Sequence, residues 1–429
     1  MKNENLFLES KKVLVGGVNS PVRAISPYPF FVSRGEGARL YDEEGNTYVD
    51  YCQAFGALIL GHNHPSVRRA VQECLHNGWC FGTPTEAELE YGRFLTQRVP
   101  NVDKIRCMNT GTEATMTAVR LARGFTGRDK IIKIEGAFHG AHDSVLVKAG
   151  SGALTHSVPD SKGVPLDVTK NTILIPFNDL DSLERALMES KEQVAALITE
   201  PVIGNAGCIL PRQGYLQGAK KILAEHGSLL ILDEVITGFR LAAGGAQEYY
   251  GVDADIVTMG KVVGGGFPIG IVGARAEIMD ELTPLGPVYN AGTFNGHPVS
   301  IAAGLATLKT IEKERMLDKV AQTGRRLQKG LADIVDDLGL GYQVQGVGPM
   351  FQVYFNSSPV WDLTGANASD AESFLGYCAN LRKNGVHLPP SQFECCFVSS
   401  AHENEIVDFS LDQFAEAMGE VRSGKNAGQ

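Results

Sequence analysis

Short apolar runs recur through the middle of the chain, and segments with helical spacing separate them. The runs are KIRCMN (104–109), KIIKIE (130–135), VAALITE (194–200), LLILDEV (229–235) and DIVTMG (255–260). After the first run, the residues that repeat at helical spacing are Ala114, Ala118, Leu121 and Ala122. The stretch GYLQGAKKILAEHG (214–227) has the pattern of a helix that ends at a glycine. Apolar strands that alternate with helices predict a parallel sheet with helices on both faces.

The pattern changes after about residue 300. Residues 301–338 have the pattern of a long helix, GYQVQGVGPMFQVYF (341–355) alternates like strands, and 409–422 is helical again. Near the start, FVSRGEGARLYDEEGNTYVDY (31–51) predicts a hairpin, because turn residues separate its alternating segments.

These patterns together predict an α/β fold with two parts. A large domain over 58–305 holds the mostly parallel sheet, and a smaller α+β domain combines 1–57 with 306–429. The segment 150–170 is rich in Gly, Ser and Pro and lacks periodicity, which is typical of a mobile lid or of a plain surface loop.

Composition and charge exclude several classes of protein. The 429 residues are 43% hydrophobic and 21% charged, which is ordinary for a globular chain with a large core. The net charge of -10 argues against an extended phosphate-binding face, so we expect no nucleic-acid partner. No apolar run reaches the length of a membrane span, and MKNENLFLESKK lacks the apolar core of a secretory signal. We therefore expect a cytoplasmic protein without membrane contact.

Cysteine and histidine spacing gives no metal signature. Eight cysteines are scattered along the chain and none forms a CxxC pair, which favours reduced cysteines that act as small apolar residues. The pairs His62/His64 and His139/His142 have no carboxylate or cysteine at a metal-binding spacing. We expect no metal site.

The strand LLILDEV resembles the magnesium-binding strand of a nucleoside triphosphatase, because it ends in Asp233 and Glu234. That interpretation needs a GxxxxGK loop followed by Ser or Thr. The GxxxxGK of this chain, Gly419 to Lys425, is followed by Asn426. The triphosphatase hypothesis therefore fails, and a merely structural acidic strand end remains open.

Lys261 lies between an apolar run and three glycines, Gly264–Gly266. An unpaired buried ammonium is costly, and a glycine run lets the backbone approach a ligand closely. Lys261 and Asp233 both end apolar strands of one predicted sheet, and open α/β sheets bind ligands at that edge. A lysine that forms a Schiff base and a carboxylate that holds a pyridine nitrogen are what pyridoxal phosphate requires.

The same cofactor needs a phosphate site and a partner for its ring. Thr110-Gly111-Thr112 ends the first strand and opens a helix, where backbone N–H groups favour an anion. An ordinary helix cap is the alternative for these residues. Phe138 follows the second strand and can stack on a ring, or it can be a core residue.

Six stretches carry a resemblance to a known family: NTGTEA, EGAFHGAHDSVLVKAGSG, EPVIGNAG, LLILDEVITGFR, MGKVVGGGFPIG and AGTFNGHP. Their order and spacing resemble the class III aminotransferases of pyridoxal-phosphate fold type I over nearly the whole chain. GGVNSPVRA (16–24), VLVKAGSG (145–152) and PPSQFECCFVSSAH (389–402) are similar to the aminomutase branch of that family. The resemblance implies a homodimer that makes 5-aminolevulinate for tetrapyrroles from glutamate-1-semialdehyde, with glutamyl-tRNA reductase as a partner through the pathway.

The resemblance also implies roles for individual residues. Lys261 becomes the Schiff-base lysine and Asp233 the partner of the pyridine nitrogen. The other implied cofactor-binding residues are Gly111, Thr112, Phe138, Asn205, Val235 and the partner subunit's Thr293. Phe138 replaces the usual tyrosine of these aminomutases, and Phe55 stands where bacterial members have tryptophan. His297, in FNGHP, departs from the family pattern without an interpretation.

The expected substrate site separates an aminomutase from a transaminase. Arg23 suits the clamp for a single substrate carboxylate, with a surface arginine as the alternative. Glu394 stands where many transaminases of the class have an arginine, so it is expected to repel a dicarboxylate donor, with a solvated loop glutamate as the alternative. Ser20 and Ser151 are expected to line the substrate site and the lid.

Two other functions remain open. One is a class III aminotransferase that uses a separate amino donor, which requires only that the argument from Glu394 is wrong. The other is a catalytically inactive relative that acts as a regulator or scaffold. The intact pair of Lys261 and Asp233 argues against the second function.

Overall fold

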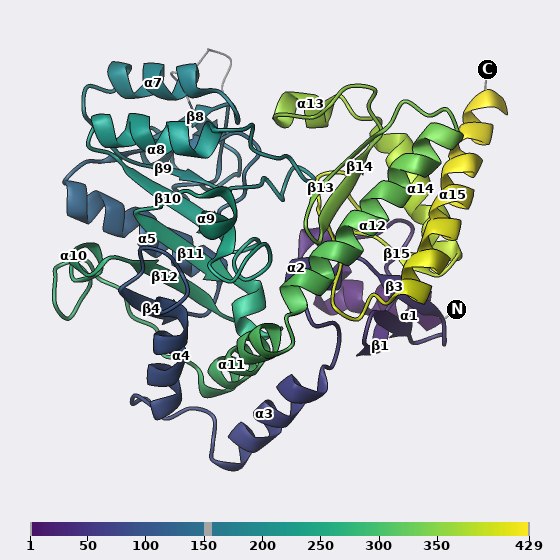
Figure 1. The fold of residues 1–429 in the computed structure, drawn as a ribbon, viewed down its shortest axis with the longest axis horizontal. Helices are drawn as coiled ribbons and strands as arrows, with labels where there is room; N and C mark the ends of the chain where they lie inside the picture. The colour runs from purple at the N-terminus through teal and green to yellow at the C-terminus, as the bar shows by residue number, and fades with distance from the viewer. Residues whose placement is uncertain (1, 150–156, 428–429) are drawn as a thin grey trace.

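The computed structural model describes residues 2–149 and 157–427, and its larger part is built around a seven-stranded sheet (Figure 1). The strand order is β4-β12-β11-β10-β9-β5-β8. Their bounds are β4 Lys104–Met108, β5 Lys130–Ile134, β8 Thr172–Ile175, β9 Val194–Thr199, β10 Leu229–Glu234, β11 Ile256–Gly260 and β12 Gly270–Ala274. Strands β11, β10, β9, β5 and β8 pair in parallel, and β12 is antiparallel to both of its neighbours, so β4 runs in the same direction as the other five. The expected mostly parallel sheet is confirmed.

Helices cover both faces of this sheet, as the continuous apolar runs predict. Alternate strand residues point to opposite faces. On one face Leu197 and Leu230 pack with α8 (Tyr215–Glu225). On the other face Ala196 and Ile231 pack with α5 (Gly111–Thr126). Strand β9 is buried along its whole length, which requires an apolar residue at nearly every position.

The two ends of the chain meet in smaller sheets. The first has the order β1-β2-β3-β15, with β1 Val32–Glu36, β2 Arg39–Asp42, β3 Thr47–Asp50 and β15 Val386–His387. The second has the order β13-β14-β16, with β13 Gln343–Val347, β14 Met350–Tyr354 and β16 Cys396–Phe397. Since β15 pairs in parallel with β3, residues from both chain ends share one sheet. The domain boundaries 1–57, 58–305 and 306–429 stay predictions.

The helical pattern over 301–338 is two helices rather than one. They are α11 (Pro298–Lys313) and α12 (Met316–Asp337). Arg315 between them has a φ of 50°, in the left-handed region that a continuous helix cannot include. The last helix, α15 (Asn404–Ala427), is longer than the expected 409–422.

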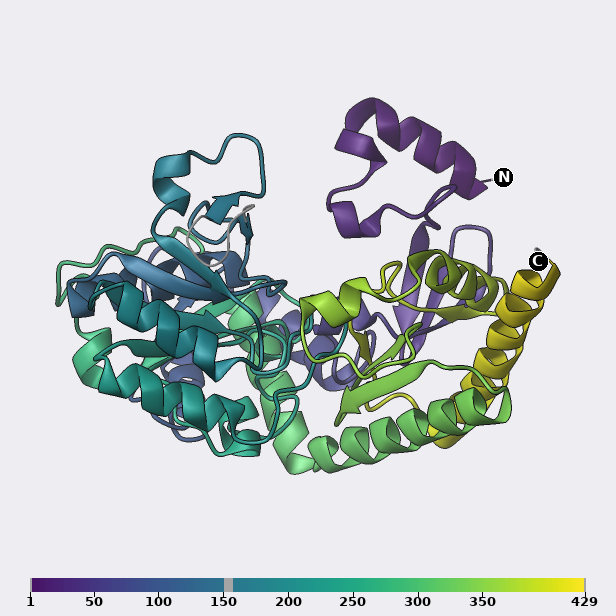
Figure 2. The same cartoon turned by 90° about the horizontal axis from the view of Figure 1, so that it is seen from above.

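The remaining elements connect these units. The helices are α1 Lys2–Val13, η1 Val15–Gly17, η2 Pro21–Arg23, α2 Gln53–Gly56, α3 Pro65–His76, α4 Glu86–Thr96, α6 Leu166–Thr169, α7 Leu180–Glu189, α9 Gly245–Tyr250, η3 Lys261–Gly264, α10 Ala276–Met279, α13 Leu363–Asn367 and α14 Ala371–Lys383. Figure 2 shows the N-terminal segment with α1 standing out from the body of the molecule. No helix within the described ranges is long and apolar enough to cross a membrane.

The segment expected as an irregular lid contains some regular structure. Strand β7 (Ser157–Pro159) pairs with β6 (Val147–Ala149), and α6 follows in the same segment. The second half of 150–170 therefore contains regular elements, and the role of this segment as a lid stays a prediction. Ser151 lies outside the described residues.

Candidate active site

Lys261 and Asp233 lie at the carboxyl ends of adjacent parallel strands. Asp233 belongs to β10 and is paired in register with Thr258 of β11. Lys261 directly follows β11 and has a φ of 51°. A non-glycine residue in this left-handed region is strained, and such strain concentrates at functional sites.

The Asp233 carboxylate is buried and fixed by several groups. Its Oδ1 accepts hydrogen bonds from the Thr258 hydroxyl at 2.9 Å and from the Val235 N–H at 3.1 Å. Its Oδ2 is 2.7 Å from Nδ1 of His139. Burial lowers the pKa of His139, and the carboxylate opposes that shift. In the part of the chain that the structure describes, Nε2 of His139 is buried without a partner. The Asp233–His139 pair therefore presents a fixed polar edge to a ligand.

Glu200 is a buried acid at the same edge that the sequence interpretation missed. Its Oε1 accepts from the Phe138 N–H at 3.1 Å. Its Oε2 accepts from the Gly204 N–H at 3.0 Å and from the Asn205 side-chain amide at 3.1 Å. Burial raises the pKa of Glu200 to about 7, and the charge of Asp233 adds to this. The available signal was its place directly after β9, the neighbour of β10.

Four charged groups surround the half-buried Lys261. Burial lowers the pKa of its ammonium, and the nearby charges are Glu200, Arg240, Glu394 and Asp233. Burial likewise raises the pKa of Glu394, and the charge of Lys261 opposes that shift. Glu394 and Lys261 are therefore close enough to act on each other electrostatically, although they come from distant parts of the sequence.

Arg240 is a second group that the sequence interpretation missed. Its side chain is 1% exposed, and burial lowers its pKa to about 10. Its Nε donates to the Ile236 carbonyl at 2.9 Å, and its Nη2 donates to the Gly56 carbonyl. The guanidinium lies over the Phe397 ring, 4.7 Å from the centroid.

The start of α5 forms a cradle for an anion. Thr110 caps this 16-residue helix by accepting from the Glu113 N–H at 3.2 Å. The Thr112 hydroxyl accepts from the Ala141 N–H at 3.2 Å. A Cβ at Gly140 would lie 2.5 Å from that hydroxyl, so only glycine fits there. The free N–H groups of the first helical turn suit a phosphate.

Glycines also keep the cradle against the sheet. A Cβ at Gly111 would lie 3.1 Å from a methyl of Val235, which packs beneath the helix start. A Cβ at Gly270 of β12 would lie 2.0 Å from the Thr110 carbonyl oxygen. The close approach of β12 to the cradle therefore depends on glycine.

The other residues singled out from the sequence are distributed over three regions. Phe138 is 53% exposed beside the buried His139, so its ring is available for stacking. Phe55 is half-buried in α2. The carbonyl of the next residue, Gly56, accepts a hydrogen bond from Arg240. Thr293 is exposed on the loop before α11. Phe138 and Asn205 both donate to Glu200, whose charge acts on Lys261. The charge of Glu394 acts on Lys261 as well.

Ser20 and Arg23 lie on the N-terminal segment, and Arg23 is exposed. Among the described residues, no hydrogen bond or ion pair joins either side chain to Lys261. Their roles at the substrate site stay predictions.

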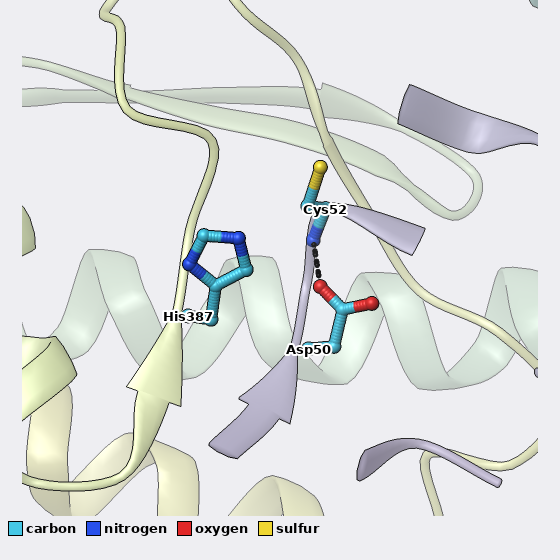
Figure 3. A group of neighbouring side chains, drawn as sticks. All are labelled: Asp50, Cys52 and His387. Carbon is cyan, nitrogen blue, oxygen red and sulfur yellow. Dashed lines mark hydrogen bonds between the residues drawn. The ribbon is translucent and has the colours of Figure 1, made fainter. Parts of the chain in front are cut away.

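One buried group has the composition of a metal site. The donor atoms of Asp50, Cys52 and His387 lie within 4.8 Å of one another (Figure 3). The Asp50 oxygens already bind the Cys52 N–H at 2.9 Å and Nε2 of His62 at 2.7 Å. Burial raises the pKa of the Cys52 thiol, which keeps it protonated. The expectation that the protein has no metal stays a prediction.

Comparisons with known proteins agree with this geometry. Residues 22–416 match the family model described as aminotransferase class-III. A curated protein from Methanothrix thermoacetophila, named glutamate-1-semialdehyde 2,1-aminomutase, is 55% identical over 412 residues, which cover 96% of this chain and 95% of that protein.

Two solved structures extend the comparison. An omega-transaminase from Sphaerobacter thermophilus has a TM-score of 0.92 and 32% identity, with 98% of both chains covered. A glutamate-1-semialdehyde aminomutase from Pseudomonas aeruginosa, in complex with PMP, has a TM-score of 0.88 and 25% identity, with 98% of this chain and 94% of that chain covered. The folds are those of fold type I enzymes that use pyridoxal phosphate. With a family match over most of its length, the chain belongs to the class-III aminotransferases.

Proposed function

We propose that this protein converts glutamate-1-semialdehyde into 5-aminolevulinate by moving an amino group within one molecule, with pyridoxal phosphate as its cofactor. The likeness to named aminomutases over nearly the full chain supports the reaction. The observation that carries the proposal is the position of Glu394, whose charge acts on Lys261. An acid at this place disfavours the dicarboxylate donor that a glutamate-dependent transaminase must bind.

The residues at the carboxyl edge of the sheet fit this cofactor. Lys261 would hold it covalently, Asp233 would pair with the ring nitrogen, and the Thr110–Thr112 cradle would take the phosphate. The exposed ring of Phe138 and the amide of Asn205 would contact the ring and its oxygen. When bound, the cofactor supplies an electron sink that stabilises negative charge on the carbon next to the transferred nitrogen.

Lys261 also suits the role of proton carrier. Burial lowers the pKa of its ammonium, so the neutral amine is more accessible near neutral pH than for an exposed lysine. The strained backbone at φ 51° sets the direction in which the side chain leaves the chain. The amine can then accept a proton from one carbon and return it to another without leaving the site.

We propose that one residue attracts the substrate carboxylate and another repels molecules with a second carboxylate. Arg23 would clamp the single substrate carboxylate, and Ser20 would assist it. Phe55 would form an apolar wall beside the carbon chain. Glu394 would repel a second carboxylate, so that a substrate with one carboxylate is favoured over glutamate.

A second copy of the chain would complete the site. Thr293 is exposed, and so are the neighbouring Phe294 (55%), Phe81 (48%) and Trp79 (58%). Residues 80–85 and 292–298 line one hollow there. Large exposed aromatic side chains are typical of interfaces between proteins. We propose a homodimer in which the partner subunit's Thr293 binds the phosphate, with glutamyl-tRNA reductase as the supplier of substrate.

The decisive experiment is to measure 5-aminolevulinate formation from glutamate-1-semialdehyde with no added amino donor or acceptor. Sustained turnover is expected, and addition of glutamate as a donor should leave the rate unchanged. Lys261→Ala is the control and should abolish turnover. If the native protein forms product only when a donor is supplied, the proposal is wrong and the protein is a transaminase, as the likeness to the Sphaerobacter enzyme allows.

A further inference from the structure

Two residues separate strand β3 from a left-handed turn, which makes up the short element α2. Gln53, Ala54, Phe55 and Gly56 have φ values of 45°, 52°, 56° and 90°. Only the last is a glycine, and L residues with side chains rarely adopt this conformation. Three consecutive non-glycine residues of this kind persist only where the surroundings hold them in place.

The buried carboxylate of Asp50 holds the start of this turn. Its Oδ1 accepts from the Cys52 N–H at 2.9 Å, a bond drawn in Figure 3. Its Oδ2 accepts from the Gln53 N–H at 3.2 Å and lies 2.7 Å from Nε2 of His62. The Gln53 side chain donates in return to the Asp50 carbonyl at 2.7 Å. One carboxylate therefore joins the strand, the turn and His62.

Arg240 holds the end of the turn by donating to the Gly56 carbonyl. Glycine is favoured at this point because Gly56 has a φ of 90°, and a Cβ there would also lie a tight 3.0 Å from the Phe397 ring and 3.1 Å from the guanidinium. The turn is thus fixed at both ends by buried charged groups, and Phe55 lies between them.

The turn borders the Lys261 neighbourhood. Burial and the charge of Asp50 raise the pKa of the Cys52 thiol. The charge of Glu394 adds to this shift, and that of Lys261 opposes it. Arg240 in turn acts on Lys261. Cys52, just before the turn, and Arg240, at its end, are therefore electrostatic neighbours of the proposed catalytic lysine.

We propose that Asp50 is a positioning residue, which sets substrate affinity by holding the left-handed turn 53–56 so that Phe55 forms one wall of the substrate site. This inference rests on the proposed function, because the substrate-contacting role of Phe55 belongs to that proposal. Asp50 itself does not touch substrate or cofactor. It acts through the turn, and the cofactor-binding edge of the sheet is built by other residues.

The test combines Asp50→Asn with a glycine that favours the left-handed conformation. Asp50→Asn puts an amide N–H where a carboxylate oxygen accepts, so the turn should loosen and Phe55 should no longer be held in place. KM for the substrate should then rise about tenfold or more, with little change in kcat or in the absorbance of the bound cofactor. Ala54→Gly in the same chain should recover most of the KM, since glycine adopts φ near 52° without strain. Ala54 is exposed, so this change removes no core packing.

The matched control is Ala57→Gly, at a position in the same loop with ordinary helical φ and ψ of −75° and −21°. It should not rescue Asp50→Asn. If Asp50→Asn leaves KM unchanged, or if both glycines rescue equally, the proposal is overturned. Should Asp50→Asn fail to fold, Ala54→Val in the native chain replaces it, and KM should rise because a β-branched residue disfavours the left-handed region. Ala57→Val is the control for this variant and should leave KM unchanged.

Two measurements separate this inference from the proposed function. Phe55→Ala tests the wall directly: a raised KM there with an unchanged KM in Asp50→Asn refutes only the role of Asp50. Hydrogen exchange of the amides of residues 52–58 needs no substrate. Exchange should be faster in Asp50→Asn than in the native protein, and Ala54→Gly should restore the native rate. Unchanged exchange in Asp50→Asn refutes the claim that Asp50 holds the turn, even if the native protein makes no 5-aminolevulinate.

Discussion

Replacing Glu200 by glutamine separates the cost of a buried charge from the value of its hydrogen bonds. The side chain keeps its size, but one acceptor oxygen becomes an N–H donor. In the structure Oε1 faces the Phe138 N–H, and Oε2 faces the Gly204 N–H and the Asn205 amide. Whichever way the glutamine amide turns, its NH₂ group faces a donor.

The magnitudes of the two effects are similar. Burial raises the pKa of Glu200 from 4.5 to about 7, and this shift is equivalent to roughly 3 kcal/mol against the charged form. Loss of a hydrogen bond that leaves a buried donor unpaired costs about 1–3 kcal/mol. Above pH 7 the two effects nearly cancel, so Glu200→Gln should change the free energy of unfolding by no more than about 2 kcal/mol.

The dependence on pH gives the sharper expectation. Because the folded pKa lies above the unfolded value, the stability that protonation of Glu200 contributes is fully present below pH 4.5 and is lost as the pH rises through about 7. The variant lacks this titration. Between pH 4.5 and pH 8 the stability of the variant should therefore rise relative to the native protein by up to about 3 kcal/mol.

Urea unfolding of both proteins without cofactor, at several pH values, measures this difference. Glu234, which burial also gives a pKa of about 7, contributes the same slope to both proteins and cancels. Parallel stability curves across this pH range would refute the reasoning, because they would mean that Glu200 does not change protonation on unfolding.

Three further outcomes are expected. Gly270→Ala should destabilise the protein by about 3 kcal/mol or more in thermal unfolding, since the new Cβ would lie 2.0 Å from a carbonyl oxygen. Gly419→Ala is the control and should be neutral or stabilising, because its Cβ would meet nothing within 4 Å. Glu394→Arg should allow glutamate to act as an amino donor in a coupled assay, and no gain in donor use would contradict the repulsion argument. Mixed dimers of Lys261→Ala and Thr293→Ala chains should recover up to about a quarter of native activity, because half of the dimers are mixed and each mixed dimer holds one complete site out of two. Recovery no greater than the sum of the separate variants would exclude a shared site.

Some of the residues proposed to bind the cofactor were predicted from the sequence because their signals are local. Strands alternate with helices, and two of the apolar runs are followed by Asp233 and by Lys261. This local pattern predicts that both residues lie at one edge of a parallel sheet, without any knowledge of distant contacts. The same pattern predicted a helix that opens at Thr110–Thr112 beside that edge, and α5 begins there. Family resemblance added Glu394, whose charge acts on Lys261 in the folded protein.

Other features depend on contacts between distant segments, so no local pattern reveals them. His139 meets Asp233 across 94 positions, and Arg240 meets the Gly56 carbonyl across 184. Their significance comes from burial, which turns an ordinary side chain into a costly charge that must be paired.

The sequence by itself predicted the class of fold, five of the seven strands of the large sheet, and a lysine and an aspartate at one edge of that sheet, because strands and helices are recognised from patterns over a few residues. Only the tertiary structure decided that one carboxylate, Glu200, joins Phe138 to Asn205, and that another, Asp50, holds a left-handed turn. The physical reason is that hydrogen bonds to a buried carboxylate gain their importance from the removal of water, and packing of the whole chain decides where water is removed.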